Sequence, residues 1–128
     1  MNNPITIAID AMGGDNAPDK VIEGISIHSK VSDNIKYKIF GNEKLIYECI
    51  KKYQISNKIF DIKHTDKKVE GEDTALYAAK RGKDTSLWLA IDSLKKNDAD
   101  AIVSAGNTGA LFLISKLNLS MIESIDKP

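Results

Sequence analysis

The segment from 104 to 109, with the sequence SAGNTG, combines two glycines with three short polar side chains. If a strand ends there and a helix starts near Asn107 or Thr108, free backbone N–H groups and the positive helix end would point at a ligand. Short side-chain donors suit phosphate oxygens or a thioester carbonyl. A tight turn that needs glycine only for its geometry explains the same pattern. We expect Ser104, Gly106 and Gly109 to bind substrate, and we keep Asn107 and Thr108 as catalytic candidates.

A second glycine-rich segment follows the apolar run at 5–9. The adjacent Gly13 and Gly14 would let the backbone pass close to a ligand. The carboxylates of Asp10 and Asp15 could hold a metal, orient a base or cap the following helix, and capping or loop bracing is the commoner role. We keep Gly13, Gly14 and Asp15 as substrate-binding candidates and Asp10 as a catalytic one.

Two further candidates lie between the glycine-rich segments. The densest basic patch, at 80–83, includes Lys83 and could bind phosphate or an acidic protein surface, although a solvated charge cluster is the simpler explanation. Ser86, near the start of an expected helix, could donate to an anion, and helix capping accounts for it nearly as well.

The usual nucleophiles and metal ligands are poorly placed. Cys49 lies on the apolar face of an expected helix, where packing is the ordinary role of a cysteine. His28 and His64 have no partners at metal-ligand spacing and form no Ser-His-Asp pattern. We therefore expect neither a metal site nor a cofactor.

Strands alternate with helices along the chain, which predicts an α/β fold with a doubly wound, largely parallel sheet. A polar, exposed loop is expected at 64–73, and the last helix should be buried on most sides because it is almost wholly apolar. If the first and last strands are central, their loops converge on one cleft beyond the carboxyl ends of the strands. The expected strands are 5–9, 36–40, 59–62 and 101–103, and the expected helices are 18–31, 45–53, 74–80, 84–94 and 110–119.

Composition excludes several classes of protein. The formal net charge is zero and 42% of residues are apolar, so no global field attracts nucleic acid or an anionic membrane. No apolar run approaches the ~20 residues of a spanning helix, and the first residues lack the pattern of a secretory signal. With a single cysteine, we expect a cytoplasmic protein without an internal disulfide.

Two long motifs carry a family resemblance. The stretch at 7–18, IAIDAMGGDNAP, resembles the opening signature of the phosphate acyltransferase (PlsX) family, and the stretch at 103–111, VSAGNTGAL, resembles its second signature. Between them, the stretch at 83–86 is similar to a lysine-rich, serine-containing segment of the family. Thr85 stands where the family usually has serine, and it keeps the hydroxyl.

The resemblance implies a fold similar to the isocitrate/isopropylmalate dehydrogenase and phosphotransacetylase group. It implies transfer of a long-chain acyl group from acyl carrier protein to orthophosphate, in a cytoplasmic homodimer that often sits loosely at the membrane. A membrane glycerol-3-phosphate acyltransferase would consume the acyl phosphate. Orthophosphate would bind at 106–109, with Asp10 or Lys83 orienting it.

The resemblance covers all of 1–128 but only the first part of the family's length, with the last residues at 126–128 where other members continue. We expect an N-terminal portion of the α/β domain that lacks the second half of the cleft. Two alternatives stay open: a truncated, inactive remnant or phosphate-ligand binding module of the same fold, and a short-chain phosphate acyltransferase that uses coenzyme A.

Overall fold

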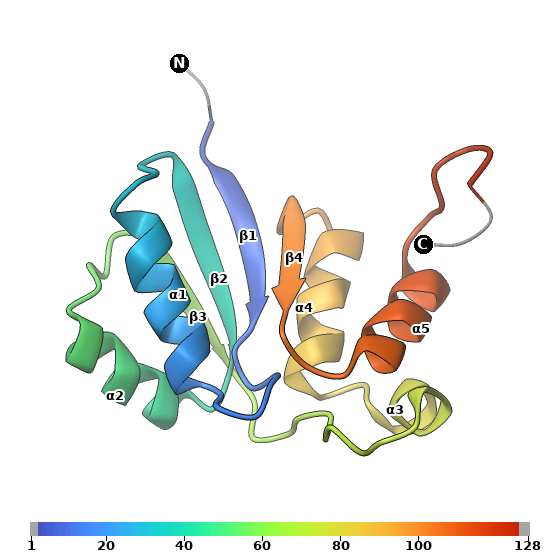
Figure 1. Ribbon diagram of the computed structural model, residues 1–128. Helices are drawn as coiled ribbons and strands as arrows, with labels where there is room; N and C mark the ends of the chain where they lie inside the picture. Colours follow the sequence, from blue (N-terminus) through green and yellow to red (C-terminus); the bar gives the residue numbers. More distant parts are fainter. Residues whose placement is uncertain (1–2, 126–128) are drawn as a thin grey trace.

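Over residues 3–125, which are the residues described, the computed structural model has a four-stranded sheet with the order β3-β2-β1-β4 (Figure 1). All strand pairs are parallel, so the predicted α/β, doubly wound fold is confirmed. The strands are β1 (Ile5–Asp10), β2 (Ile35–Gly41), β3 (Phe60–His64) and β4 (Ala101–Ser104). The helices are α1 (Asp19–Ser29), α2 (Glu43–Tyr53), α3 (Ala75–Arg81), α4 (Ser86–Lys95) and α5 (Thr108–Asn118).

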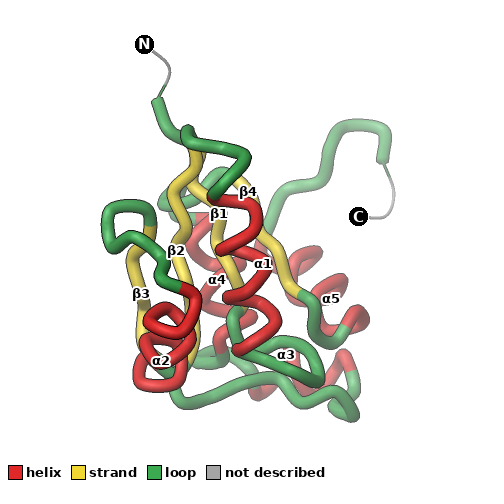
Figure 2. Tube along the Cα trace, turned by 60° about the vertical axis from the view of Figure 1, so that its left-hand side comes forward, coloured by secondary structure: helices red, strands yellow, loops and turns green. Residues whose placement is uncertain are grey.

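Alternating side chains of β1 and β2 pack against helices on both faces of the sheet. On one face, Ile9 and Ile39 join buried residues of α1 and α2 in a single cluster. On the other face, Ala8 and Phe40 pack with Ala90 of α4. Strands buried on both faces read as near-continuous apolar runs, which is the pattern of β1 in the sequence. Figure 2 shows the sheet between α1 and α4.

Side-chain caps fix where helices begin. Asn42, Thr74, Thr85 and Asn107 each accept a hydrogen bond from the backbone N–H three residues later, at the starts of α2, α3, α4 and α5. This satisfies an N–H group that has no partner within the helix. Pro18 precedes α1, as predicted. Gly82 ends α3 where a Cβ would collide with the Ala78 carbonyl oxygen, so only glycine fits there.

The last strand and helix are less buried than the sequence suggested. Strand β4 lies at the edge of the sheet rather than in its centre, and its Val103 side chain is 53% exposed. The prediction that the helix at 110–119 is buried on most sides is wrong for this chain, because over residues 3–125 α5 packs mainly against α3 and α4 and leaves its other sides open. Ala110 and Ile114 are buried, whereas Phe112 is 41% and Leu117 63% exposed. Within residues 3–125, no helix is long and apolar enough to cross a membrane.

Candidate functional site

The two glycine-rich loops meet beyond the carboxyl ends of β1 and β4. These strands are hydrogen-bonded neighbours, with Asp10 paired to Ser104. From β1 the chain crosses to β2 on one side, while β4 is the neighbour of β1 on the other side. The two loops therefore open at a topological switch point, where open parallel sheets bind ligands. The predicted convergence is confirmed although β4 is an edge strand.

Asp10 connects three elements beneath these loops. One carboxylate oxygen accepts a 2.6 Å hydrogen bond from the Ser86 hydroxyl at the start of α4. The other accepts a 2.9 Å bond from the Ser104 hydroxyl at the end of β4. Asp10 is only 3% exposed and Ser86 is buried as well. Both side chains are thus placed to hold the loops in position.

Close contact between the loops requires glycine at two positions. A Cβ on Gly13 would lie 2.7 Å from the Asp10 Oδ2 atom and 3.0 Å from the Gly106 nitrogen. A Cβ on Gly106 would lie 3.0 Å from the Gly13 Cα atom. The backbones of the two loops are therefore in direct contact at Gly13 and Gly106, with no side chain between them. This contact joins the loops and shapes the surface above Asp10.

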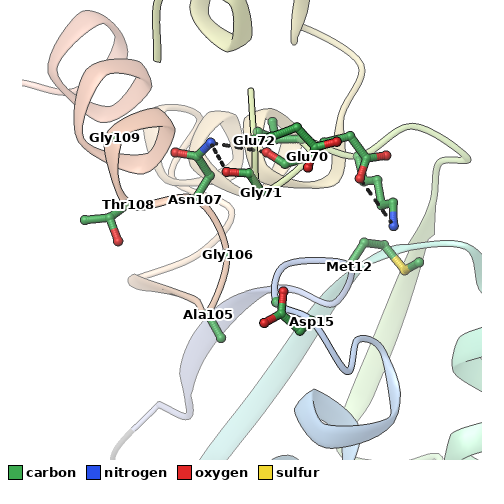
Figure 3. A pocket seen from close by; sticks show the side chains of 13 residues that line it. Met12, Asp15, Glu70, Gly71, Glu72, Ala105, Gly106, Asn107, Thr108 and Gly109 are labelled. Carbon is green, nitrogen blue, oxygen red and sulfur yellow. Dashed lines mark hydrogen bonds and ion pairs between the residues drawn. The ribbon is translucent and has the colours of Figure 1, made fainter. Parts of the chain in front are cut away.

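A cavity of about 690 Å³ opens beside these loops. Its volume is in the range of small-molecule sites. One wall is the β4–α5 turn at 105–109, and the loop at 68–72 forms the wall opposite (Figure 3). Met12, Gly14 and Asp15 of the first loop complete the lining. The site therefore combines three segments far apart in the sequence.

Asn107 joins the two walls through its side-chain amide. The Nδ2 group donates to the carbonyl oxygens of Asp73 at 2.7 Å and Glu70 at 3.2 Å. The Oδ1 atom accepts from the Ala110 N–H at 3.0 Å, which caps α5. Both ends of the amide are thus occupied by the protein, so Asn107 shapes the cavity in this conformation.

The start of α5 offers unsatisfied donors to the cavity. In the described part of the chain, the backbone N–H groups of Asn107, Thr108 and Gly109 have no protein acceptor. All three residues line the cavity. Free N–H groups at a helix N-terminus form an anion site, which the helix dipole favours further.

The rest of the lining is acidic. It includes Asp15 of the first loop and Glu70 and Glu72 of the wall at 68–72, and among the lining residues only Lys68 is basic. Lys68 lies 3.7 Å from a Glu70 carboxylate oxygen, so its charge is already shared. An anion would therefore be held close to the α5 amides, while the carboxylates repel it from the opposite side.

The structure distributes the candidate residues in three ways. Lys83 is exposed and is not part of the cavity lining. The lining includes Gly14, Asp15, Gly106, Asn107, Thr108 and Gly109. Asp10, Gly13, Ser86 and Ser104 lie in the layer beneath. Their roles in binding or catalysis stay predictions.

Sequence reasoning missed the wall at 68–72. Its polar, acidic sequence predicts an exposed loop, and four of its five residues are indeed exposed. Its place opposite the α5 turn depends on hydrogen bonds from Asn107 across more than thirty positions. A single sequence carries no signal for such a pairing.

Cys49 and His28, which the sequence does not place as a nucleophile or a metal ligand, have structural roles. Cys49 packs partly buried against the cluster around α1 and α2, and burial raises the pKa of its thiol. The neutral thiol is a poor nucleophile. The His28 Nδ1 atom lies 2.6 Å from the Tyr37 hydroxyl. Over residues 3–125, no group of three or more potential ligands could hold a metal ion.

Comparison with known proteins gives one consistent result. A family model described as "Fatty acid synthesis protein" matches residues 5–128. The chain is 54% identical over 128 residues to a phosphate acyltransferase of Pelagibacter ubique, and covers 38% of that protein. It is 38% identical to a phosphate acyltransferase of Rhodospirillum rubrum and 39% identical to one of Enterococcus faecalis, covering 37% and 35% of them. The chain thus spans little more than a third of these relatives.

Proposed function

The chain belongs to the fatty acid synthesis protein family, and from that premise we propose that it forms the N-terminal part of a phosphate acyltransferase. The complete enzyme would convert an acyl thioester of acyl carrier protein and orthophosphate into acyl phosphate for phospholipid synthesis. The observation that carries the proposal is the cavity at the switch point, with three free N–H groups at the start of α5. Relatives named phosphate acyltransferase match the whole chain.

Orthophosphate would bind at the N–H groups of Asn107, Thr108 and Gly109, within reach of a thioester carbonyl. A phosphate oxygen attacks the carbonyl carbon, the new C–O bond forms, and the C–S bond breaks. The carrier thiolate leaves and takes up the proton of the hydrogen phosphate. Positioning accounts for much of the rate, since phosphate is already a nucleophile and thiolate a fair leaving group. Donors near the carbonyl oxygen would stabilise the developing charge.

The partners follow from the family resemblance. We propose acyl carrier protein as the thioester donor, a homodimer as the assembly of the complete enzyme, and a membrane glycerol-3-phosphate acyltransferase as the consumer of the product. The enzyme would work in the cytoplasm and at the membrane surface. These proposals concern the longer protein, because the chain covers 38% or less of the relatives.

A phosphate-ligand binding module is the second candidate. The free N–H groups of Asn107, Thr108 and Gly109 favour it, since they can bind a phosphate group whether or not a reaction follows. A short-chain enzyme that uses coenzyme A remains the third possibility. The two candidate enzymes are separated by assaying a protein as long as the relatives for acyl phosphate formation. One assay supplies an acyl carrier protein thioester and phosphate, and the other supplies a coenzyme A thioester and phosphate. Formation of acyl phosphate from neither donor would contradict both.

Substitution at Thr108 tests the anion site in this chain. Thr108 is the first residue of α5, where proline is well tolerated, and Asn107 before it has the extended conformation that proline requires. Thr108→Pro thus removes one free N–H without breaking the helix, whereas Thr108→Ala removes only the hydroxyl. We expect Thr108→Pro to weaken inorganic phosphate binding about tenfold, since a hydrogen bond to a charged group contributes roughly 1.5–3 kcal/mol.

The measurement is a titration with inorganic phosphate followed by amide chemical shifts. In the wild-type chain, the largest shifts should occur at 106–109, and Thr108→Ala should bind more tightly than Thr108→Pro. Equal affinities for the wild type and Thr108→Pro, with both folded, would rule out the α5 amides as the phosphate site.

A further inference from the structure

A second hollow, of about 380 Å³, lies on the α1 face of the sheet. It is an apolar groove between α1 and β4, with β1 as its floor. Its aliphatic lining consists of Ile7, Ile9, Val21, Ile25 and Val103.

Within residues 3–125 no helix covers the α1 side of β4, and this leaves the groove open. Helices α1 and α2 pack over β1 and β2 on this face, while α4 packs on the opposite face. Ile102 points to the α4 side, so Ala101 and Val103 point to the α1 side, and both are exposed. Figure 1 shows β4 next to β1 at the edge of the sheet, with α1 to the left of β1 and with α4 and α5 to the right of β4.

The groove adjoins the proposed phosphate site. Ala105 lines both the apolar groove and the polar cavity, and Asp10 at the end of β1 lines the groove. From Asp10 the groove follows β1 back to Ile7 and its neighbour Tyr37. Three residues of strand correspond to roughly 10 Å. A ligand with its polar group at the α5 turn could therefore extend an apolar chain along β1.

We propose that this groove binds the acyl chain of the thioester substrate. The inference rests on the proposed function, since that function supplies a ligand with a reacting polar end and a long alkyl tail. The aliphatic lining matches an alkyl chain, and burial of both surfaces favours binding. The charged group of Lys20, which also lines the groove, is paired with Glu23 at 2.8 Å.

Gly24 gives a direct way to fill the groove. It belongs to α1 and lines the groove, and a Cβ built there would meet no atom within 4 Å. The side chain of Gly24→Leu therefore starts in open space and extends into the groove. Leucine is also a better helix former than glycine, so the variant should fold at least as well as the wild type. Gly24→Ala is the matched control, because it removes the glycine and leaves most of the groove open.

Monoalkyl phosphates with chains of four to ten carbons, below their micelle concentrations, serve as probes beside inorganic phosphate. In the wild-type chain, we expect affinity to rise about threefold to fourfold for each added CH₂ until the groove is full. Gly24→Leu should abolish this rise and leave inorganic phosphate binding unchanged. Gly24→Ala should keep most of the rise.

The outcomes separate the groove from the phosphate site. The inference is overturned if affinity does not rise with chain length, or if it rises equally in Gly24→Leu. In either case, binding of inorganic phosphate would still support the proposed function. A change of oligomeric state in Gly24→Leu without any alkyl dependence also overturns it, because the groove is then covered by polypeptide. If affinity rises with chain length and Gly24→Leu removes this rise, but inorganic phosphate does not bind, the result supports the groove and contradicts the phosphate site.

Discussion

Asp10 is the residue on which the geometry of the loops depends. Its buried carboxylate accepts hydrogen bonds from Ser86 and Ser104, which belong to different elements. A buried carboxylate is stable only when such donors are present. The aspartate in the first family-like motif is therefore explained by its position beneath the loops, where it fixes how β1, β4 and α4 meet.

Alanine substitutions should distinguish the two kinds of glycine in the site. At Gly13 a methyl group would approach the Asp10 carboxylate to 2.7 Å, whereas at Gly109 it would meet Ala75 at 3.4 Å, an ordinary contact. We expect Gly13→Ala to lower the free energy of unfolding by about 1–3 kcal/mol, as overpacking does. Gly109→Ala should change it little. Chemical denaturation provides the measurement.

Bulkier substitutions extend the comparison to ligand binding. Gly13→Val and Gly109→Val should both weaken phosphate binding more than Cys49→Ala, since Cys49 packs against the α1–α2 cluster away from the cavity. Folding is checked separately by circular dichroism. Equal losses of binding in the folded valine variants and Cys49→Ala would contradict the site assignment.

At the level of helices and strands, the sequence predicted nearly all of the order and type of the elements. Apolar periodicity located the helices, and capping residues such as Thr85 and Asn107 marked their starts within a residue or two. The edge position of β4 and the wall at 68–72 escaped prediction. Both depend on which segments are neighbours in space, and local pattern carries no information about that.

Asn107 has two separable roles at the boundary of α5. Serine at this position would still cap the helix but is too short to reach the loop at 70–73, whereas alanine would lose both interactions. We expect Asn107→Ser to keep the stability of α5 and Asn107→Ala to lose about 1 kcal/mol of capping energy. Both should speed hydrogen exchange at the amides of Glu70 and Asp73, which bond within the loop. Unchanged exchange at these amides would show that Asn107 does not hold the loop.

For the whole molecule, one exposed apolar surface lies on α3 and α5. Leu76 and Tyr77 of α3 are exposed, as are Phe112 and Leu117 of α5. Helices α3 and α5 pack against each other, so their exposed residues belong to neighbouring elements. Large exposed apolar patches mark surfaces that other structure covers. The relatives are long enough to supply it, since the chain covers 38% or less of them.

We therefore expect the 128-residue chain alone to self-associate and to have negligible acyltransferase activity. The cavity has an acidic wall and only a shared lysine, so charge stabilisation for a phosphate dianion must come largely from outside the described lining. Sedimentation measures the association, and acyl phosphate formation from acyl carrier protein thioester measures the activity. Leu117→Lys, on an exposed position of α5, should reduce association without loss of fold. A monomeric wild-type chain with substantial turnover would refute both expectations, because the site would then be complete within this third of the family's length.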